Sequence, residues 1–325
     1  MRRLALFAAA VPLLFAAACG GAGGETATGS GPSATAAGTP VASASDLKVT
    51  GEIGSKPQVT FPEGAPPKTS SSFVLKEGSG TPAKDGDTVV ANLSAFNWDG
   101  KENRLALSTY DKGLPEVIPV DGKALPKVVY EAFRGAKPGS RLVTVVAVDS
   151  LTPQQLEQAK KAGTDKIASL FVIDVVDTAV AKAAQGPATD PGIEGITLKN
   201  PGGDEAPVLT TKTDRKAPED LIAKTVIKGS GPAVKKGQLL LVQYTGKIWG
   251  TDKEFDSSWR KGKPTIFQIG TGKVIKGWDQ SLVGVPVGSR VLLSIPPKYG
   301  YGDKGQGPIK GTDTLVFVVD VLGAY

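Results

Sequence analysis

Runs of β-branched, aromatic and leucine residues alternate with short breaks rich in glycine and proline in the last third of the chain. Runs of this kind predict β-strands, which we place at residues 238–248, 265–269, 290–295 and 314–322. The segment 275–285 differs, because Trp278, Leu282 and Val285 recur at spacings of four and three residues, as on one face of a short helix. Several strands and one short helix predict an α+β domain, a curved antiparallel sheet wrapped around that helix.

The chain also contains an internal repeat. Three segments of one half match three of the other in the same order: 78–87 with 229–238, 138–141 with 287–290, and 170–175 with 316–321. The matching segments lie 146 to 151 residues apart, which indicates a duplicated domain rather than chance similarity. We therefore predict two related domains, at residues 66–178 and 216–325.

The segment between the two predicted domains, 179–215, has no aromatic residue and contains several Gly-Pro and Pro-Gly turn signals. Such composition predicts a linker with turns. Part of this linker can be ordered, because residues 193–210 weakly resemble residues 49–59.

The N-terminus has the layout of an export signal. Arg2 and Arg3 precede an uncharged apolar stretch, 4–18, which as a helix would be about 22 Å long and too short for the roughly 30 Å core of a bilayer. Ala18 leads directly into Cys19, the single cysteine, and this junction resembles a bacterial lipoprotein lipobox. We expect a signal peptide at residues 1–18 and a lipid on Cys19.

A lipid on Cys19 would anchor the exported protein on the outer face of the bacterial cytoplasmic membrane. The alternative is an ordinary signal-peptide cleavage site that leaves Cys19 as a free thiol. The chain that follows is built of small and polar residues and has no aromatic residue up to Thr60. Because such a stretch can bury little apolar surface, we interpret residues 19–65 as a flexible tether.

The amino-acid composition excludes several kinds of catalytic and metal-binding site. The 325 residues include no histidine and one cysteine, which excludes His-based triads, zinc sites built on His or Cys, and a disulfide within the chain. We expect neither a metal nor a cofactor. The net charge of +6 comes from 38 basic and 32 acidic residues, a mixed surface rather than a basic stripe, so no nucleic-acid partner is expected.

Five blocks of the second predicted domain share their order and spacing with one known family. They are Tyr244-Thr245-Gly246, Phe255-Asp256-Ser257-Ser258, Val274-Ile275-Lys276-Gly277-Trp278, Tyr299-Gly300-Tyr301-Gly302 and Thr314-Leu315-Val316-Phe317. With them, residues 216–325 resemble the FKBP-type peptidyl-prolyl cis-trans isomerases over their whole length. The resemblance implies two FKBP-like α+β domains and an isomerase activity that uses no cofactor.

The resemblance also implies a shallow apolar cleft that holds a proline ring. Trp278 would form its floor, and its walls would come from Tyr244, Phe255, Val274, Ile275, Ile309 and Phe317. Asp256, Tyr301 and the backbone of residues 274–275 would supply polar contacts. Asp256 could instead be a solvated turn residue or a partner of Arg260, and we interpret Phe267 as ordinary core.

Two positions depart from the family pattern. Thr265 stands where another wall aromatic is common, and the loop 303–312 lacks the proline pair and the histidine of some members. The first departure would loosen the cleft, and the second would change sequence preference and macrolide affinity.

A cleft of this kind needs no acid, base or nucleophile. Rotation about an X-Pro bond is slow because the amide must lose resonance, and a pocket that binds the twisted amide best lowers that barrier. The expected partners are proline-containing polypeptides of exported proteins and macrolide inhibitors. We thus predict an isomerase that assists the folding of exported proteins; the alternative is a non-catalytic chaperone or scaffold.

The first predicted domain has lost the residues of the cleft. Leu93 replaces Tyr244, Val129 replaces Trp278 and Ser108 stands approximately at Asp256. The Tyr-rich loop is replaced by residues 149–163, which include a predicted helical segment. We expect a degenerate domain that keeps the scaffold but not the cleft, with four aromatic residues either in the core or on a new contact surface: Phe96, Trp98, Tyr130 and Phe133.

Overall fold

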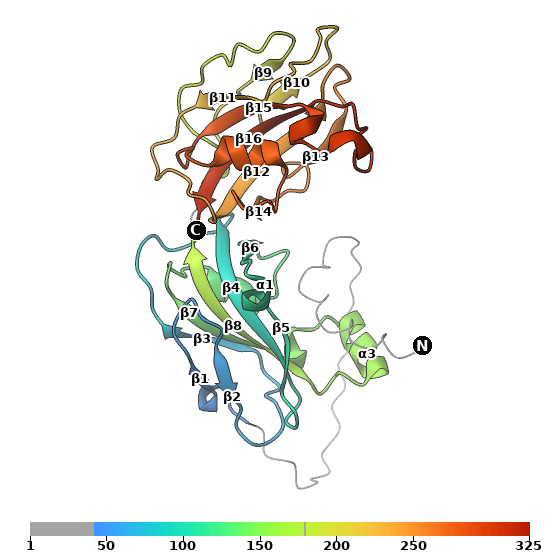
Figure 1. Ribbon diagram of the computed structural model, residues 1–325. Coiled ribbons are helices and arrows are strands. Elements are labelled where there is room, and N and C mark those ends of the chain that lie inside the picture. The colour runs from blue at the N-terminus through green and yellow to red at the C-terminus, as the bar shows by residue number, and fades with distance from the viewer. Residues whose placement is uncertain (1–41, 179) are drawn as a thin grey trace, which may run out of the picture. The chain divides into compact units, whose positions relative to one another are not determined.

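Each half of the chain folds around its own six-stranded antiparallel sheet (Figure 1). The structure is a computed structural model that describes residues 42–178 and 180–325, and these residues form two units that divide at residue 179. Both units combine one large sheet with short helices, so the predicted α+β class and the duplicated architecture are confirmed.

The second unit contains the strands that the hydrophobic pattern predicts. Its sheet has the order β11-β15-β16-β12-β13, with β14 paired to β12, and its strands are β11 (Ile222–Ile227), β12 (Leu239–Ile248), β13 (Glu254–Ser257), β14 (Thr265–Gln268), β15 (Arg290–Ile295) and β16 (Leu315–Ala324). The single α-helix, α4 (Lys276–Leu282), buries Trp278 and Leu282 against the sheet. Two 3₁₀ turns follow β15, at Pro297–Tyr299 and Gly302–Lys304.

The first unit repeats this topology. Its sheet has the order β3-β7-β8-β4-β5, with β6 paired to β4, and its strands are β3 (Ser71–Lys76), β4 (Thr88–Trp98), β5 (Arg104–Ser108), β6 (Glu116–Pro119), β7 (Arg141–Val146) and β8 (Ala168–Asp177). Its helices are α1 (Thr109–Lys112), α2 (Lys127–Phe133) and α3 (Pro153–Ala162), and 3₁₀ turns lie at Ala44–Asp46 and Val148–Ser150. Helix α3 is the predicted helical segment of 149–163, and a capping box of Thr152 and Gln155 begins it.

A small hairpin precedes the sheet in each unit. Both folded units therefore begin earlier in the sequence than the predicted domains. Strands β1 (Lys48–Thr50) and β2 (Gln58–Thr60) pair in the first unit, and β9 (Thr197–Lys199) and β10 (Val208–Thr210) pair in the second. The flexible tether predicted for 19–65 is therefore wrong from residue 42 onward, because Phe61 packs edge-to-face on Trp98 at 5.3 Å. Residues 1–41, including Cys19 and the predicted signal peptide, lie outside the described residues.

The predicted linker 179–215 is likewise part of the second folded unit from residue 180 onward. Its Leu209 is 2% exposed, in an apolar cluster with Val316, Val318 and Trp249 on the face of the sheet opposite α4. The two hairpins also account for the weak similarity between residues 49–59 and 193–210.

A buried ion pair fastens each hairpin to its sheet. In the first unit Arg141 donates to Asp174 at 2.6 Å and also to the backbone oxygen of Gly51 at 2.6 Å, between β1 and β2. In the second unit Arg290 donates to Asp320 at 2.6 Å and to Asn200 at 2.9 Å, next to β9. Two of the matched segment pairs, 138–141 with 287–290 and 170–175 with 316–321, thus supply the arginine and the aspartate of the same clamp in each unit.

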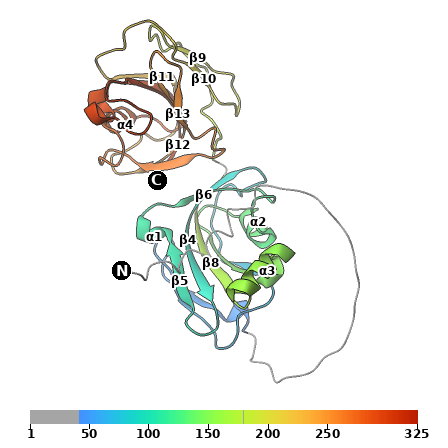
Figure 2. The same ribbon diagram turned by 90° about the vertical axis from the view of Figure 1, so that its right-hand side faces the viewer.

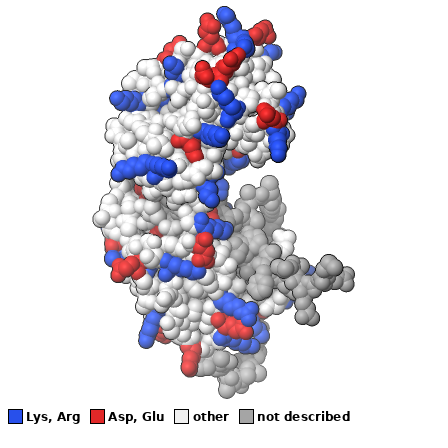
Figure 3. Space-filling model, viewed as in Figure 1, with Lys and Arg blue, Asp and Glu red and all other residues white. Residues whose placement is uncertain are grey.

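Three of the four aromatic residues in question in the first unit are core. Phe96, Trp98 and Phe133 are buried, whereas Tyr130 lies partly exposed and donates its hydroxyl to Asp85 at 2.5 Å. Within residues 42–178 and 180–325 no helix is long and apolar enough to cross a membrane. Basic and acidic side chains are interspersed on the face seen in Figure 3, as the near-balanced composition predicts.

Candidate active site

The second unit has a cavity of about 810 Å³ between its sheet, the start of α4 and the loop after β15. Eight of the nine predicted cleft residues line it: Tyr244, Phe255, Asp256, Val274, Ile275, Trp278, Tyr301 and Phe317. They come from five separate segments of the chain, so the cavity exists only in the folded unit.

Trp278 is held by aromatic rings on three sides. Its ring centroid lies 5.4 Å from Tyr244, 5.3 Å from Phe267 and 5.4 Å from Phe317, and all three contacts are edge-to-face. Such contacts add about 0.5–1.5 kcal/mol each beyond the buried area. The indole therefore forms a fixed apolar surface, 4% exposed, that borders the cavity.

Gly246 allows two walls of the cavity to meet. A Cβ atom on Gly246 would lie 2.6 Å from Cζ of Phe255 and 2.8 Å from Cε1 of Phe317, closer than real Cβ atoms come to other atoms. Because glycine has no Cβ, these two rings pack edge-to-face at 5.3 Å across β12. The glycine of the Tyr-Thr-Gly block is thus a packing requirement of the cleft.

Asp256 carries the negative charge of the cavity. Its carboxylate accepts a hydrogen bond from Tyr244 Oη at 2.5 Å and forms an ion pair with Lys261 Nζ at 2.5 Å. Burial alone would raise the pKa of Asp256, but the bonds from Lys261 and Tyr244 outweigh it and hold the pKa below its usual range. The predicted alternative partner, Arg260, instead pairs with Glu254 at 3.3 Å.

The two cavity tyrosines stay protonated over a wide range. Burial and the hydrogen bond to Asp256 raise the pKa of Tyr244. Burial and the charge of Asp256 raise the pKa of Tyr301, which lies between the two 3₁₀ turns after β15. Both hydroxyls therefore remain neutral donors at physiological pH.

Asp279 shapes the loop that enters α4. It accepts hydrogen bonds from Gly270 N at 2.6 Å and Gly272 N at 2.7 Å, and so ties the end of β14 to the helix. The carbonyl of Ile275 accepts from Trp278 N at 3.0 Å. The amide N–H of Ile275, in contrast, has no backbone partner among the described residues, and Ile275 lines the cavity.

Ile309 and Phe267 are placed differently from the sequence prediction. Ile309 is 7% exposed in the core cluster under the loop and is not a lining residue, because its backbone closes a tight turn with Gln306. Phe267, interpreted from the sequence as ordinary core, lines the cavity and contacts both Tyr244 and Trp278. Its position on β14, two residues after the wall position Thr265, is the signal that would have indicated this.

Sequence reasoning also missed the charged rim of the cavity. Lys261, Lys273 and Lys276 line it together with Asp256 and Asp279. Lys273 and Lys276 flank the Val-Ile pair directly in the sequence.

The first unit has no carboxylate at the strand position that corresponds to Asp256. Ser94 pairs with Ser108 at 2.8 Å as Thr245 pairs with Ser257 at 3.1 Å, so Ser108 corresponds to Ser257. The residue equivalent to Asp256 is therefore Leu107, one position from that predicted.

A smaller cavity of about 240 Å³ lies at this place in the first unit, lined by Leu125, Pro126 and Phe171 together with α3. Helix α3, beside α2 in Figure 2, takes the place of the Tyr-rich loop. A cavity thus lies at this place in the first unit too, but without counterparts of Tyr244, Asp256 and Trp278 in its lining.

No cluster of three or more potential metal ligands occurs in the described ranges 42–178 and 180–325. The site is instead an aromatic cleft with one carboxylate and two tyrosine hydroxyls, on an antiparallel sheet wrapped over a short helix. This combination defines a class of domain suited to a small apolar ring attached to a polar backbone.

Comparison with known proteins identifies the family. Residues 231–322 match the family model for FKBP-type peptidyl-prolyl cis-trans isomerase. The chain is 45% identical over 107 residues to an FK506-binding protein of Streptomyces anulatus, covering 32% of this chain and 86% of that protein. It is 40% identical over 109 residues to a probable FK506-binding protein of Corynebacterium glutamicum, covering 33% of this chain and 90% of the relative.

Among solved structures, the crystal structure of AtFKBP13 is 39% identical, covering 34% of this chain and 96% of that one, with a TM-score of 0.31. On the sequence relationships, the chain belongs to the FKBP-type peptidyl-prolyl cis-trans isomerase family.

Proposed function

We propose that this protein is a peptidyl-prolyl cis-trans isomerase that assists the folding of exported proteins, and that its second unit carries out the reaction. The observation that carries the proposal is the convergence of Trp278, Asp256 and Tyr301 on one apolar cavity. The family relationship supports the reaction class, and the N-terminal export pattern supports the choice of clients.

The proposed mechanism requires no covalent step. Rotation about an X-Pro bond meets a barrier of about 18–20 kcal/mol, because the planar amide must lose its resonance. A twisted amide has less charge separation than a planar one, so the aromatic walls around Trp278 favour it over the planar ground state. The N–H of Ile275 can donate to a substrate carbonyl, and Tyr301 can do the same from the opposite loop.

Asp256 acts as a positioning residue in this mechanism. Its bond to Tyr244 fixes the ring that in turn packs on Trp278. The ion pair with Lys261 keeps the carboxylate ionised, so the position of the wall does not depend on pH near neutrality.

The first unit is proposed to be non-catalytic. Leu93, Leu107 and Val129 stand where the second unit has Tyr244, Asp256 and Trp278. Replacing the indole by valine removes most of the roughly 150–250 Å² that a large aromatic ring buries.

The names of the relatives support FK506-type macrolides as ligands of the second cavity. The N-terminal pattern supports export and a lipid on Cys19 that anchors the protein at the outer face of the cytoplasmic membrane.

The proposal is tested by NMR exchange on a short X-Pro peptide with the chain lacking residues 1–19. Wild-type protein should accelerate cis-trans exchange. Trp278→Ala should lower kcat/KM at least tenfold, about 1.4 kcal/mol of transition-state stabilisation, because it removes the cavity floor. Asp256→Ala should have a similar effect, and Tyr301→Phe a smaller one, since the ring remains.

Tyr130→Phe in the first unit is the matched control, because it also removes one tyrosine hydroxyl, and it should leave kcat/KM unchanged. A lack of acceleration at micromolar protein would refute the enzyme and favour the alternative of a non-catalytic chaperone or scaffold. Near-wild-type activity in Trp278→Ala would overturn the assignment of Trp278 as the floor of the reacting cavity.

A further inference from the structure

Strand β3 is an edge strand of the first sheet. It pairs only with β7, and its outer edge makes no backbone hydrogen bond to any residue in the described ranges. An edge of this kind presents N–H and C=O groups that can pair with an added strand. Val74 and Leu75 on this strand are 54% and 45% exposed, although both are large apolar residues.

The second unit places its own chain against the end of the equivalent edge strand, β11, whereas Ala223, Lys224 and Thr225 on that strand remain exposed. Lys76 pairs with Arg141 after a bulge in β3, just as Ile227 pairs with Arg290 after a bulge in β11, so Leu75 corresponds to Val226. Val226 is only 1% exposed.

A preceding segment of the same unit touches the end of β11, and Val226 also packs in the apolar cluster with Leu209 and Trp249. Ala188 forms a bridge with Ile227, and Thr189 N donates to the carbonyl of Val226 at 2.8 Å. The segment that runs into this contact, residues 183–189, reads Ala-Ala-Gln-Gly-Pro-Ala-Thr and is made mostly of small, uncharged residues. The end of this edge in the second unit thus accepts a backbone hydrogen bond from an added polypeptide segment.

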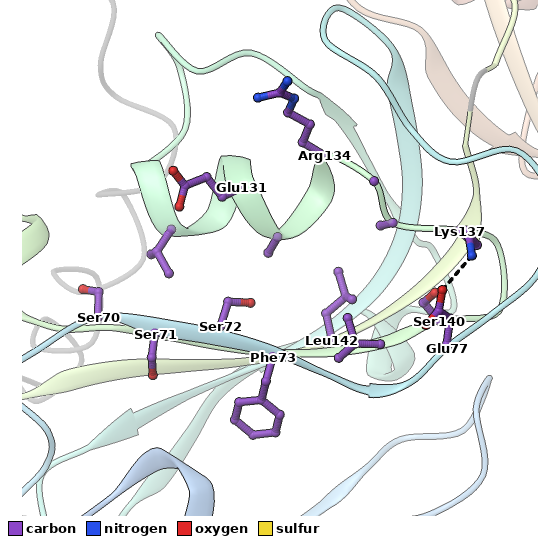
Figure 4. A pocket seen from close by; sticks show the side chains of 15 residues that line it. Ser70, Ser71, Ser72, Phe73, Glu77, Glu131, Arg134, Lys137, Ser140 and Leu142 are labelled. Atoms are coloured by element: carbon purple, nitrogen blue, oxygen red, sulfur yellow. Dashed lines mark hydrogen bonds and ion pairs between the residues drawn. The ribbon is translucent and has the colours of Figure 1, made fainter.

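A cavity of about 420 Å³ adjoins the open edge in the first unit, between β3 and α2. Figure 4 shows Ser70 and Ser72 on the side of β3 that faces the helix, and Phe73 on the opposite side. In the second unit Leu221 occupies the place of Ser70 and packs against the core. The smaller serine leaves space in which a side chain of an added strand can insert.

The rim of this cavity carries charges of both signs. Glu77 and Lys137 form an ion pair at 2.6 Å, and Glu131 and Arg134 also line the cavity (Figure 4). Because these charges balance, the rim favours neither an acidic nor a basic occupant, and an uncharged segment fits it best.

We propose that the outer edge of β3 and the adjoining cavity bind an extended, uncharged segment of an unfolded polypeptide, which joins the first sheet as an additional strand. This surface holds a client chain through backbone hydrogen bonds and through contacts with Val74 and Leu75. It requires no catalysis by the second unit and assigns a binding role to the first.

The test measures binding of a fluorescently labelled, reduced and carboxymethylated α-lactalbumin, a permanently unfolded polypeptide, to the chain lacking residues 1–19. Val74→Lys/Leu75→Lys should raise the Kd at least tenfold. The matched control is Leu105→Lys/Leu114→Lys, which adds the same charge at two other exposed leucines of the first unit, 38% and 39% exposed, and should leave the Kd unchanged. The carboxymethyl groups make the probe more negative, so the two added lysines would by charge alone attract it. A weaker affinity of Val74→Lys/Leu75→Lys therefore cannot come from charge repulsion.

A second measurement reports on contact directly. Without Cys19 the chain has no cysteine, so Leu75→Cys and Leu105→Cys each carry a single site for a benzophenone label. Cross-linking to the unfolded probe should occur from position 75 and not from position 105. With the probe bound, the amides of residues 72–76 should exchange hydrogen more slowly.

Equal affinity of the two double variants would overturn the proposal. Binding that appears only after residues 20–41 are also deleted would identify the chain's own N-terminal segment as the occupant. A dimer that dissociates in Val74→Lys/Leu75→Lys would identify a second copy; either result overturns the client assignment. Exchange on a short X-Pro peptide should be unchanged in this variant, which separates failure of this proposal from failure of the isomerase.

Discussion

Asp256 links two parts of the cavity wall through one carboxylate. It accepts from Tyr244 on β12 and pairs with Lys261 in the loop after β13. The equivalent position in the first unit is Leu107, opposite Ala95, so the first unit has neither this carboxylate nor the glycine that lets two aromatic rings meet. A few substitutions at fixed register therefore separate a polar aromatic cleft from a plain apolar one.

The pKa shifts at this site predict an isomerase that is insensitive to pH near neutrality. The pKa of Asp256 lies below its usual value of 3.8, so its bond to Tyr244 is fully present above that value and is lost as pH falls through the lowered pKa. The pKa values of Tyr244 and Tyr301 are raised above 10.0, so both hydroxyls stay protonated up to that pH. The chain has no histidine.

We therefore expect kcat/KM to be constant between about pH 5 and 9. NMR exchange on an X-Pro peptide at constant ionic strength measures this profile. Asp256→Asn should lower kcat/KM by the same factor at every pH in this range, because the variant removes the charge but not the side chain. A sigmoidal step between pH 6 and 8 would contradict the assignment.

At the scale of elements, the hairpin and the sheet of each unit form one structure through a buried ion pair. The Arg290 and Asp320 side chains are 2% and 1% exposed, and the Arg141 and Asp174 side chains are 3% each. Removing one partner of such a pair leaves an uncompensated buried charge, which costs more than the pair itself contributes.

Asp320→Ala should accordingly destabilise the second unit by about 3–5 kcal/mol, as measured by urea unfolding. The double variant Arg290→Met/Asp320→Leu should recover part of this loss, because it removes both charges. Glu219→Ala, which breaks the exposed pair with Lys216, is the control and should leave the unfolding midpoint unchanged. Equal stability of Asp320→Ala and the wild type would show that the clamp does not hold the hairpin.

At the scale of the whole molecule, each unit contains its own hairpin, sheet, helices and apolar cluster on either face of the sheet. The folded part of the first unit begins by residue 42. Residues 42–65 of the predicted tether therefore belong to the first folded unit.

We predict that Cys19 carries a lipid. Cys19→Ser should abolish incorporation of a labelled fatty acid and leave the protein in the aqueous phase or as an unprocessed precursor. Detergent-phase partitioning and mass spectrometry of the N-terminal peptide check this result. Because no other cysteine exists in the chain, any acyl label lost in the variant reports on this residue alone. A free thiol on the mature wild-type protein would indicate ordinary cleavage instead.

The sequence by itself determined the long strands, helix α4, the duplication and most of the cleft, because these depend on local hydrophobic patterns and on motifs at fixed spacing. Strand β15, for example, matches its predicted bounds, and Trp278 falls on the predicted helix.

Only the tertiary structure decided where the three-residue strands of the hairpins lie, because their stability comes from contacts such as that of Phe61 with Trp98 and not from their own short pattern. The same holds for Phe267 in the cavity, Ile309 in the core, Leu107 opposite Ala95, and the open edge of β3. Each of these depends on which segments, distant in the sequence, pair or pack together, and that choice is made by the packing of the whole unit.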